Sequence, residues 1–364
     1  MLLLSVINEL AVILGYICVS YFNFGLWVVV LGYLIEGLLG SYFILINNTF
    51  AYLADTTTSI DRSKYFVVAE GVILFSFGFG PMVGGILNRS LDPQTVFVIA
   101  FFGTTSALVA FALLLPESLD FSKVKIGNLS IAQNIKKMAN VVKQVMSPTF
   151  LCFLCGICAT AISFDGKKMM FFYNSFVFGW DSQDEGMYGL VGSLLRVANL
   201  IFIYPLLTRL FAKQLARPKG KYQFELDLVR LALFSAASAA LLISIAKQGW
   251  VLYCISILDS FGVLANPTLR SLLSGSASPA SQGMLFACVS AVDQTLKLAF
   301  NVIYPMIWSA TVDFKPNTFL LVVAAFNILG GVALMQPTAQ DVVDTRHSED
   351  DMEVEEVLIE QDLQ

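Results

Sequence analysis

Ten long apolar segments run through most of the sequence and constrain the fold more than any other feature. A helix needs about 20 predominantly apolar residues to cross a bilayer, and each segment is close to that length. Inside lipid a helix satisfies its own backbone hydrogen bonds, so segments of this kind are expected to be helical. The sequence therefore predicts an all-α integral membrane protein with about ten transmembrane helices. The predicted spans are Leu2–Phe22, Leu26–Asn48, Tyr65–Leu87, Thr95–Leu115, Thr149–Tyr173, Glu185–Arg209, Leu226–Ala246, Trp250–Leu273, Gly283–Trp308 and Thr318–Met335.

The composition excludes several other classes of protein. Hydrophobic residues make up 57% of the chain and charged residues only 13%, whereas soluble domains carry about 25% charged residues. So few charges do not cover a water-facing surface, which argues against a soluble enzyme or a nucleic-acid-binding protein. The single histidine, His347, and six cysteines within apolar stretches provide no plausible ligand set, so we expect no metal and no cofactor. The expected partners are the lipid bilayer, a small-molecule solute and protons, and we expect a monomer.

The positions of the basic residues predict the orientation in the membrane. Lysines and arginines gather in two segments between spans, 118–147 and 208–230, and with ten spans both segments lie on the same side. Basic loops favour the cytoplasmic side, so both termini are expected to be cytoplasmic, at the plasma membrane or the vacuolar membrane. All four tryptophans fall at the opposite ends of spans, where indole rings favour the interface.

The first basic segment divides the chain into two groups of spans. We predict an incomplete N-terminal helical half over 1–116, a cytoplasmic linker over 117–147 and a six-helix C-terminal half over 148–336. Residues 337–364 form an acidic cytoplasmic tail, expected to be disordered, since residues 341–364 hold ten of the 27 acidic residues. In the linker, apolar residues recur on one face of residues 130–146, which predicts an amphipathic helix on the inner leaflet. A plain solvated linker is the alternative.

A glycine–proline motif lies late in the third span. Pro81 removes one backbone hydrogen bond and is expected to kink the helix. Gly80 and Gly84 are four residues apart, which would let a facing helix approach closely, and Gly85 completes the motif. We interpret the motif as a conformational element. Ordinary packing of small residues is the alternative.

With its surroundings, this motif resembles part of a known family. The helix end Ala51–Asp55, the turn Asp61–Ser63 and the motif Gly80–Gly85 resemble the fourth and fifth helices of the major facilitator superfamily. In that pattern Asp55, Asp61 and Arg62 belong to a cytoplasmic turn.

Further segments resemble one branch of the superfamily. Leu115–Ser118 is similar to the end of its sixth helix. Phe178–Trp180, Arg196 and Tyr204–Leu207 are similar to the seventh-to-eighth helix region of fungal members of the tetracycline-resistance and proton-coupled folate transporter-like branch.

The resemblance implies a secondary active transporter of a small organic solute that is coupled to protons and works by alternating access between two helical halves. The superfamily has six plus six helices and this chain has four plus six, so the first two are expected to be missing. A non-transporting, carrier-like membrane receptor or regulator, or a truncated inactive carrier, is the alternative.

Charged residues near the middle of spans are the candidates for solute binding and proton coupling. Such a group costs about 2.5–3.5 kcal/mol on insertion scales, so it is expected to face a cavity or a partner. Counting from the span ends places Glu36, Arg196, Asp259 and Asp293 near mid-depth. Lys297 lies four residues after Asp293, so the two are expected to pair on one helix face.

We expect Arg196 to lie near Asp259, and we interpret Asp259 as a carboxylate that exchanges a proton. Packing or hydration is the alternative for Asp259 and for Glu36, and a purely structural ion pair is the alternative for Asp293. The fifth span carries three more charges in its outer half. We expect Lys167 to reach the outer interface, and we leave the roles of Asp165 and Lys168 open between solute contact and interfacial anchoring.

Overall fold

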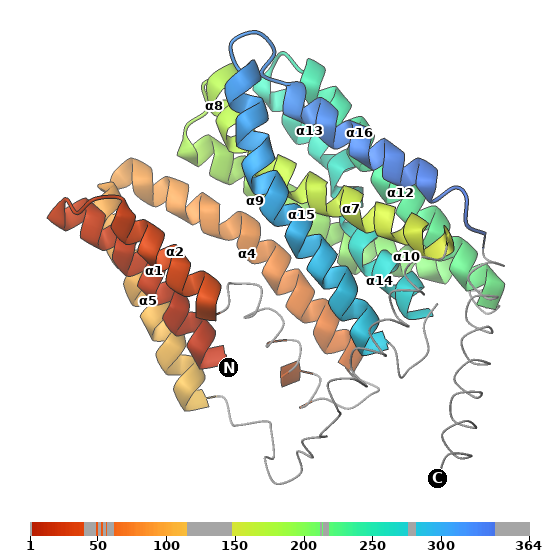
Figure 1. The fold of residues 1–364 in the computed structure, drawn as a ribbon, viewed down its shortest axis with the longest axis horizontal. Helices are drawn as coiled ribbons and strands as arrows, with labels where there is room; N and C mark the ends of the chain where they lie inside the picture. The colour runs from red at the N-terminus through yellow and green to blue at the C-terminus, as the bar shows by residue number, and fades with distance from the viewer. Residues whose placement is uncertain are drawn as a thin grey trace, which may run out of the picture. The chain divides into compact units, whose positions relative to one another are not determined.

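The computed structural model describes residues 2–39, 49, 52–53, 56, 62–114, 148–211, 213, 218–275 and 282–338. All regular secondary structure in these ranges is helical, which confirms the predicted all-α class (Figure 1). The predicted linker helix at 130–146, the acidic tail, Asp55 and Asp61 lie outside the described residues.

The helices follow the predicted apolar segments as far as those segments are described. Six helical stretches are long and apolar enough to cross a membrane, and three further apolar helices in the described ranges are shorter. The helices are α1 (Leu2–Phe22), α2 (Trp27–Leu39), α4 (Arg62–Ser90), α5 (Pro93–Leu114), α7 (Pro148–Lys168), α8 (Met170–Phe178), α9 (Ser182–Ala198), α10 (Tyr204–Leu210), α12 (Pro218–Ile245), α13 (Gly249–Ser260), α14 (Ala265–Gly275), α15 (Gln282–Thr311) and α16 (Thr318–Ala333).

The described residues fall into two compact units. The first holds those within Met1–Gly127 together with Asp181–Leu190, and the second holds those within Asn128–Trp180 and Val191–Gln364. In the first unit α1 packs against α2 and α5. The α1–α2 approach is close because Gly15 and Gly32 face the backbone of the opposite helix, and a Cβ at Gly32 would lie 3.3 Å from the Cα of Val12.

The second unit has its core where α7, α12 and α16 meet, with α15 packed against α7 (Figure 1). Phe153 of α7, Leu226 of α12 and Phe319 of α16 are completely buried there. Small residues bring α7 and α16 together, because a Cβ at Gly330 would lie 2.7 Å from the Cβ of Ala159. Small-residue packing of this kind is the usual way helices associate in lipid, where no hydrophobic force drives them together.

Three helical segments are interrupted within the second unit. Helix α7 ends at Lys168 and α8 begins at Met170. A π-helix, η2 (Asn199–Ile203), lies between α9 and α10, and a 3₁₀ helix, η3 (Phe261–Leu264), lies between α13 and α14. Such interruptions are frequently found at functional sites and hinges.

Candidate functional site

One carboxylate in the second unit is held by two cations from different helices. Asp259 lies at the end of α13, and its Oδ1 is 2.7 Å from Nζ of Lys167 on α7. Its Oδ2 accepts a 3.0 Å hydrogen bond from Nη2 of Arg196 on α9. The side chain of Asp259 is 13% exposed, whereas those of Lys167 and Arg196 are 36% and 31% exposed. We call these three residues the ion triad.

The ion triad agrees with one expectation and corrects another. The structure brings Arg196 to Asp259, as the sequence analysis expected; a coupling role for the pair stays a prediction. The expectation that Lys167 reaches the outer interface is wrong, because its ammonium group pairs with Asp259 inside the helix bundle. Helix α13 itself carries no basic residue, and both partners of Asp259 are supplied by other helices, which the sequence of one helix does not reveal.

Each member of the ion triad lies just before an interruption of its helix. Lys167 is two residues before Met169, where α7 breaks, Arg196 is three residues before η2, and Asp259 is two residues before η3. The interruptions at η2 and η3 pack together. A buried 2.6 Å hydrogen bond from Nδ2 of Asn199 to Oγ of Ser260 joins them. The ion triad is therefore placed where three helices depart from regular geometry and where small changes of backbone angle would move it.

A second group of charges lies between α7 and α15. Nζ of Lys168 is 2.5 Å from Oδ1 of Asp165, whose side chain is only 1% exposed. The same ammonium group donates a 3.3 Å hydrogen bond to Oδ1 of Asn301 on α15. Asp165 and Lys168, whose roles the sequence left open, thus form an ion pair with each other.

The pair predicted on α15 is present and adjoins this group. Nζ of Lys297 donates a 2.6 Å hydrogen bond to Oδ2 of Asp293. The ammonium groups of Lys168 and Lys297 lie 5.3 Å and 5.4 Å from the centroid of the Phe164 ring. Cation–π contacts of this length are favourable, more so where water is excluded. Helix α7 therefore carries two ion networks, one toward α9 and α13 and one toward α15.

The glycine–proline motif makes its close contact at a different residue from the one expected. Gly80 and Gly84 have no atom of the described residues within 4 Å of a built Cβ, so the close approach and the conformational role expected at these two positions stay predictions. Gly85 faces the backbone of Ser182 at the start of α9 instead. A reciprocal contact is made by Gly186 of α9, where a Cβ would lie 2.6 Å from Cα of Met82. The helix phase decides this, since residues 84 and 85 point about 100° apart.

Polar side chains extend the contact between α4 and the start of α9. Nη1 of Arg89 donates a 2.7 Å hydrogen bond to Oε1 of Gln183 and lies 4.0 Å from Oδ2 of Asp181. Asp181 caps α9, because its Oδ1 accepts hydrogen bonds from the backbone N–H groups of Gln183 and Asp184. These bonds, chiefly that from Asp184, hold the pKa of Asp181 below its ordinary value. The sequence signal for this cap is an aspartate followed by an acidic residue three positions later, just before an apolar run.

Two other predicted residues lie in the first unit. Glu36 of α2 is half-buried and close enough to Glu9 of α1 for the two carboxyl groups to interact electrostatically. Arg62 is the first residue of α4. A role of Glu36 or Arg62 in transport stays a prediction.

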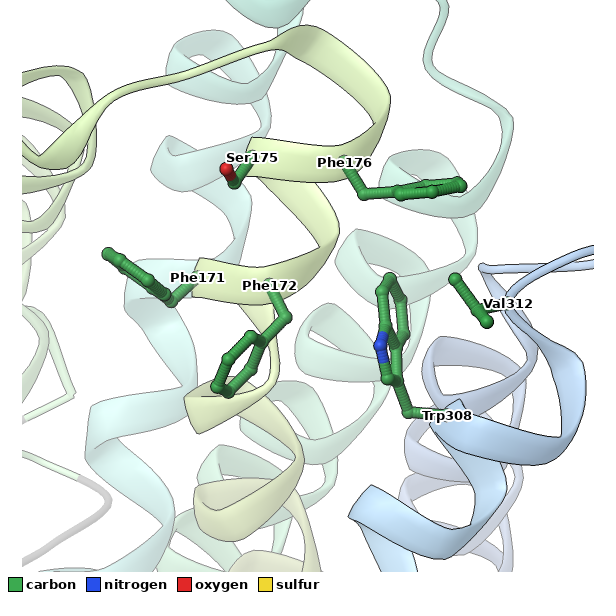
Figure 2. Close-up of a pocket in the computed structure, with 6 residues that line it drawn as sticks. All are labelled: Phe171, Phe172, Ser175, Phe176, Trp308 and Val312. Atoms are coloured by element: carbon green, nitrogen blue, oxygen red, sulfur yellow. The ribbon is translucent and has the colours of Figure 1, made fainter.

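An aromatic pocket of about 480 Å³ lies between α8 and α15 (Figure 2). Helix α8 contributes Phe171, Phe172, Ser175 and Phe176, α15 contributes Trp308, and Val312 directly follows the end of α15. The rings of Phe176 and Trp308 meet edge to face with centroids 6.0 Å apart. None of the predicted site residues lines it, and the sequence analysis missed it, because an aromatic run in a span has the same pattern whether it faces lipid or a pocket.

Comparisons with known proteins identify the family of this chain. The Major Facilitator Superfamily pattern matches residues 2–295, so the chain belongs to that superfamily. It is a family of membrane transporters, and no catalytic family is indicated. The predicted family and the multi-pass membrane fold are thereby confirmed.

Individual relatives are distant. The chain is 22% identical to the "MFS-type transporter avaJ" of Aspergillus versicolor, over 84% of this chain and 62% of that protein. It is 24% identical to the class D tetracycline resistance protein of Salmonella ordonez, over 85% and 74% of the two chains. It is also 24% identical to the lysosomal proton-coupled steroid conjugate and bile acid symporter SLC46A3 of Gallus gallus, over 83% and 65%. The chain thus spans less than two thirds of the fungal and avian proteins.

A solved structure supports the fold. The crystal structure of the human organic anion transporter MFSD10 (TETRAN) superposes with a TM-score of 0.63, at 17% sequence identity, covering 92% of this chain and 76% of that one. At this identity the likeness concerns the fold alone.

Proposed function

We propose that this protein is a secondary active transporter that moves a small organic solute, coupled to protons, by alternating access between two helical halves. The observation that carries the proposal is the ion triad: a nearly buried carboxylate in a span, shared by two cations, next to three helix interruptions. Charges inside a membrane protein are costly and are retained mainly for transport, ion relay or ligand binding. Relatives named as tetracycline resistance proteins and as a proton-coupled symporter support the same reading.

The coupling step that we propose uses the carboxylate of Asp259. While ionised, it holds Lys167 and Arg196 together and so ties α13 to α7 and α9. Protonation would remove its charge and release the two cations, because an uncharged carboxyl group binds cations far less strongly. The adjacent interruptions would then allow the helices to reorient. The other candidates for the carboxyl group that exchanges the proton are Asp165, Asp293 and Glu36.

The proposed arrangement in the membrane follows the sequence analysis. Residues 1–116 and 148–336 are the two halves, 117–147 is a cytoplasmic linker and 337–364 is a cytoplasmic tail, with both termini inside at the plasma or vacuolar membrane. A C-terminal tag that is cleaved by protease added to intact cells would contradict this orientation.

Solute flux in vesicles tests the function. The full chain is reconstituted into liposomes that contain a pH-sensitive dye, and tetracycline and the bile acid taurocholate are offered under an imposed pH gradient. We expect solute-dependent proton movement. Asp259→Asn should abolish the pH dependence and leave solute exchange largely intact, whereas Asp227→Asn, which changes an exposed carboxylate paired with Arg230, should leave both unchanged.

The outcomes separate the alternatives. Flux of a solute that does not respond to pH would retain transport and refute proton coupling. A normal pH profile in Asp259→Asn would refute the role of that residue. Specific binding of a solute by folded protein without any flux would favour the carrier-like receptor.

A further inference from the structure

The ion triad carries one positive charge more than its carboxylate balances. Among the residues that the structure describes, Asp259 is the acid that pairs with Lys167 and with Arg196. The neighbouring acids are already engaged, since Asp165 pairs with Lys168 and Asp293 pairs with Lys297 on the α15 side of α7. Helix α12, which packs against α13, has no charged residue after Arg230. Of the other described acids of the second unit, Glu225 pairs with Lys221 and Asp227 pairs with Arg230, and the structure describes no ion pair between Asp313 and either cation of the triad.

The two cations also keep unused hydrogen-bonding capacity. Arginine has five N–H donors in a planar fork and lysine has three. In the described part of the chain, Arg196 spends Nη2 and Lys167 spends Nζ on the same carboxylate. About a third of each cationic side chain is exposed, whereas Asp259 is largely covered. The open surface of the ion triad is thus cationic, and its acid lies beneath.

An uncompensated charge in a low-dielectric interior is unfavourable, and a second anion would relieve it. A planar carboxylate or a sulfonate or sulfate group fits the arginine fork, which favours paired hydrogen bonds from two N–H groups. Such a group would approach from the exposed side of the cations and would compete with Asp259 for the same donors.

We propose that Lys167 and Arg196 bind the anionic group of an organic solute beside Asp259, and that Asp259 repels this group and competes with it for the same two cations. The proposal rests on the proposed transport function and specifies its substrate class as organic anions. It also gives Asp259 an unusual property: the acid lowers the affinity of the site for its ligand. A residue with only a structural role in the site would have the opposite effect when it is removed.

Binding of matched probes tests this inference. The purified full chain is placed in phosphatidylcholine nanodiscs and titrated with 2-naphthalenesulfonate and with the neutral 2-naphthalenemethanol, using calorimetry. We expect the sulfonate to bind at least about tenfold more tightly than the alcohol, because hydrogen bonds between charged groups are stronger than those that a neutral hydroxyl group forms.

Four variants sharpen the test. Lys167→Gln and Arg196→Gln should each weaken sulfonate binding about tenfold and leave alcohol binding unchanged. Asp259→Asn should strengthen sulfonate binding about tenfold. Lys221→Gln, which removes an exposed lysine near the start of α12, is the control for general charge effects and should change neither affinity.

Several results would overturn the inference. Equal affinity for sulfonate and alcohol would show that the ion triad does not select anions. Weaker sulfonate binding in Asp259→Asn would show that the acid supports the site instead of competing with it, and this test stands even if the lysine or arginine variant fails to fold. Displacement of the sulfonate in phosphatidylglycerol nanodiscs would assign the site to a lipid headgroup and refute a free solute.

The failure of this inference is distinguishable from the failure of the proposed function. Coupled flux of a neutral solute together with no preference for the sulfonate would retain the transporter and refute the anion site. Selective sulfonate binding without flux of any solute would retain the site and refute the transporter.

Discussion

Replacing Gly85 by alanine should destabilise the contact between α4 and the start of α9. A Cβ built on Gly85 lies 2.9 Å from the carbonyl carbon of Ser182 and 3.0 Å from Cα of Gln183. Carbon atoms in ordinary contact are about 3.5–4.0 Å apart. The obstructing atoms belong to the backbone, so no side-chain rotation relieves the overlap and the two segments have to separate.

The expected cost follows from this overlap. Forcing one extra methyl group into a packed contact costs about 1–3 kcal/mol. Gly84, the preceding residue, has no described atom within 4 Å of a built Cβ. Gly84→Ala should be neutral or should stabilise α4 by up to about 1 kcal/mol, because alanine is the better helix former. The two variants should therefore differ by about 1–4 kcal/mol although they change neighbouring residues in the same way.

Thermal unfolding of the purified protein in detergent, followed by tryptophan fluorescence, measures the difference. We expect a lower midpoint for Gly85→Ala than for the natural protein, and an unchanged or higher midpoint for Gly84→Ala. Equal midpoints for the two variants would refute the packing contact at Gly85. A lower midpoint for Gly84→Ala alone would restore the close approach that the sequence spacing suggested.

Three further predictions concern stability. Gly166→Ala should lower the free energy of unfolding by about 1–3 kcal/mol, because a Cβ at this position would meet side chains of α15 and α16. A Cβ at Gly192 meets no described atom within 4 Å, so Gly192→Ala is the control, and equal unfolding midpoints for the two variants would refute the prediction. Asn327→Leu should cost about 1–3 kcal/mol in the same assay, since it removes the buried 2.6 Å hydrogen bond to Ser163; an unchanged midpoint would contradict it. The lowered pKa of Asp181 contributes stability above its unfolded pKa of about 4, and this is lost as pH falls through the folded pKa. Asp181→Asn should therefore lose less stability between about pH 5 and pH 3 than the natural protein, and identical pH profiles would refute the role of the cap.

Much of the fold was predictable from the sequence because lipid imposes a simple rule on it. A span has to be apolar, helical and about 20 residues long, and these three properties are visible in one dimension. Helix α1 has the bounds that the apolar pattern predicted, and α5 differs by two residues at its start and one at its end. The pairing of Asp293 with Lys297 was equally predictable, because residues four apart on a helix are neighbours.

The candidate site was predictable only in its components. Asp259, Arg196 and Asp165 stood out because charged residues are rare in spans, but their partners depend on which helices pack together. Lys167 shows this dependence. Its place in the sequence predicts that it reaches the outer interface, whereas in the structure it pairs with Asp259 in the ion triad. The interruptions at η2 and η3 each precede a proline, Pro205 and Pro267, which is a local signal for a disturbed helix. The hydrogen bond that joins the two interruptions has no such signal, because Asn199 and Ser260 are 61 residues apart.

The sequence by itself determined the class of protein, the approximate spans and the residues able to carry charge into the membrane. Only the tertiary structure decided which charges share a site and which glycine makes a helix contact. The physical reason is that hydropathy acts on each residue separately, whereas ion pairing and close packing depend on distances between residues far apart in the chain. Gly84 and Gly85 are identical in type and adjacent in sequence, yet only the helix phase and the position of α9 distinguish the open residue from the packed one.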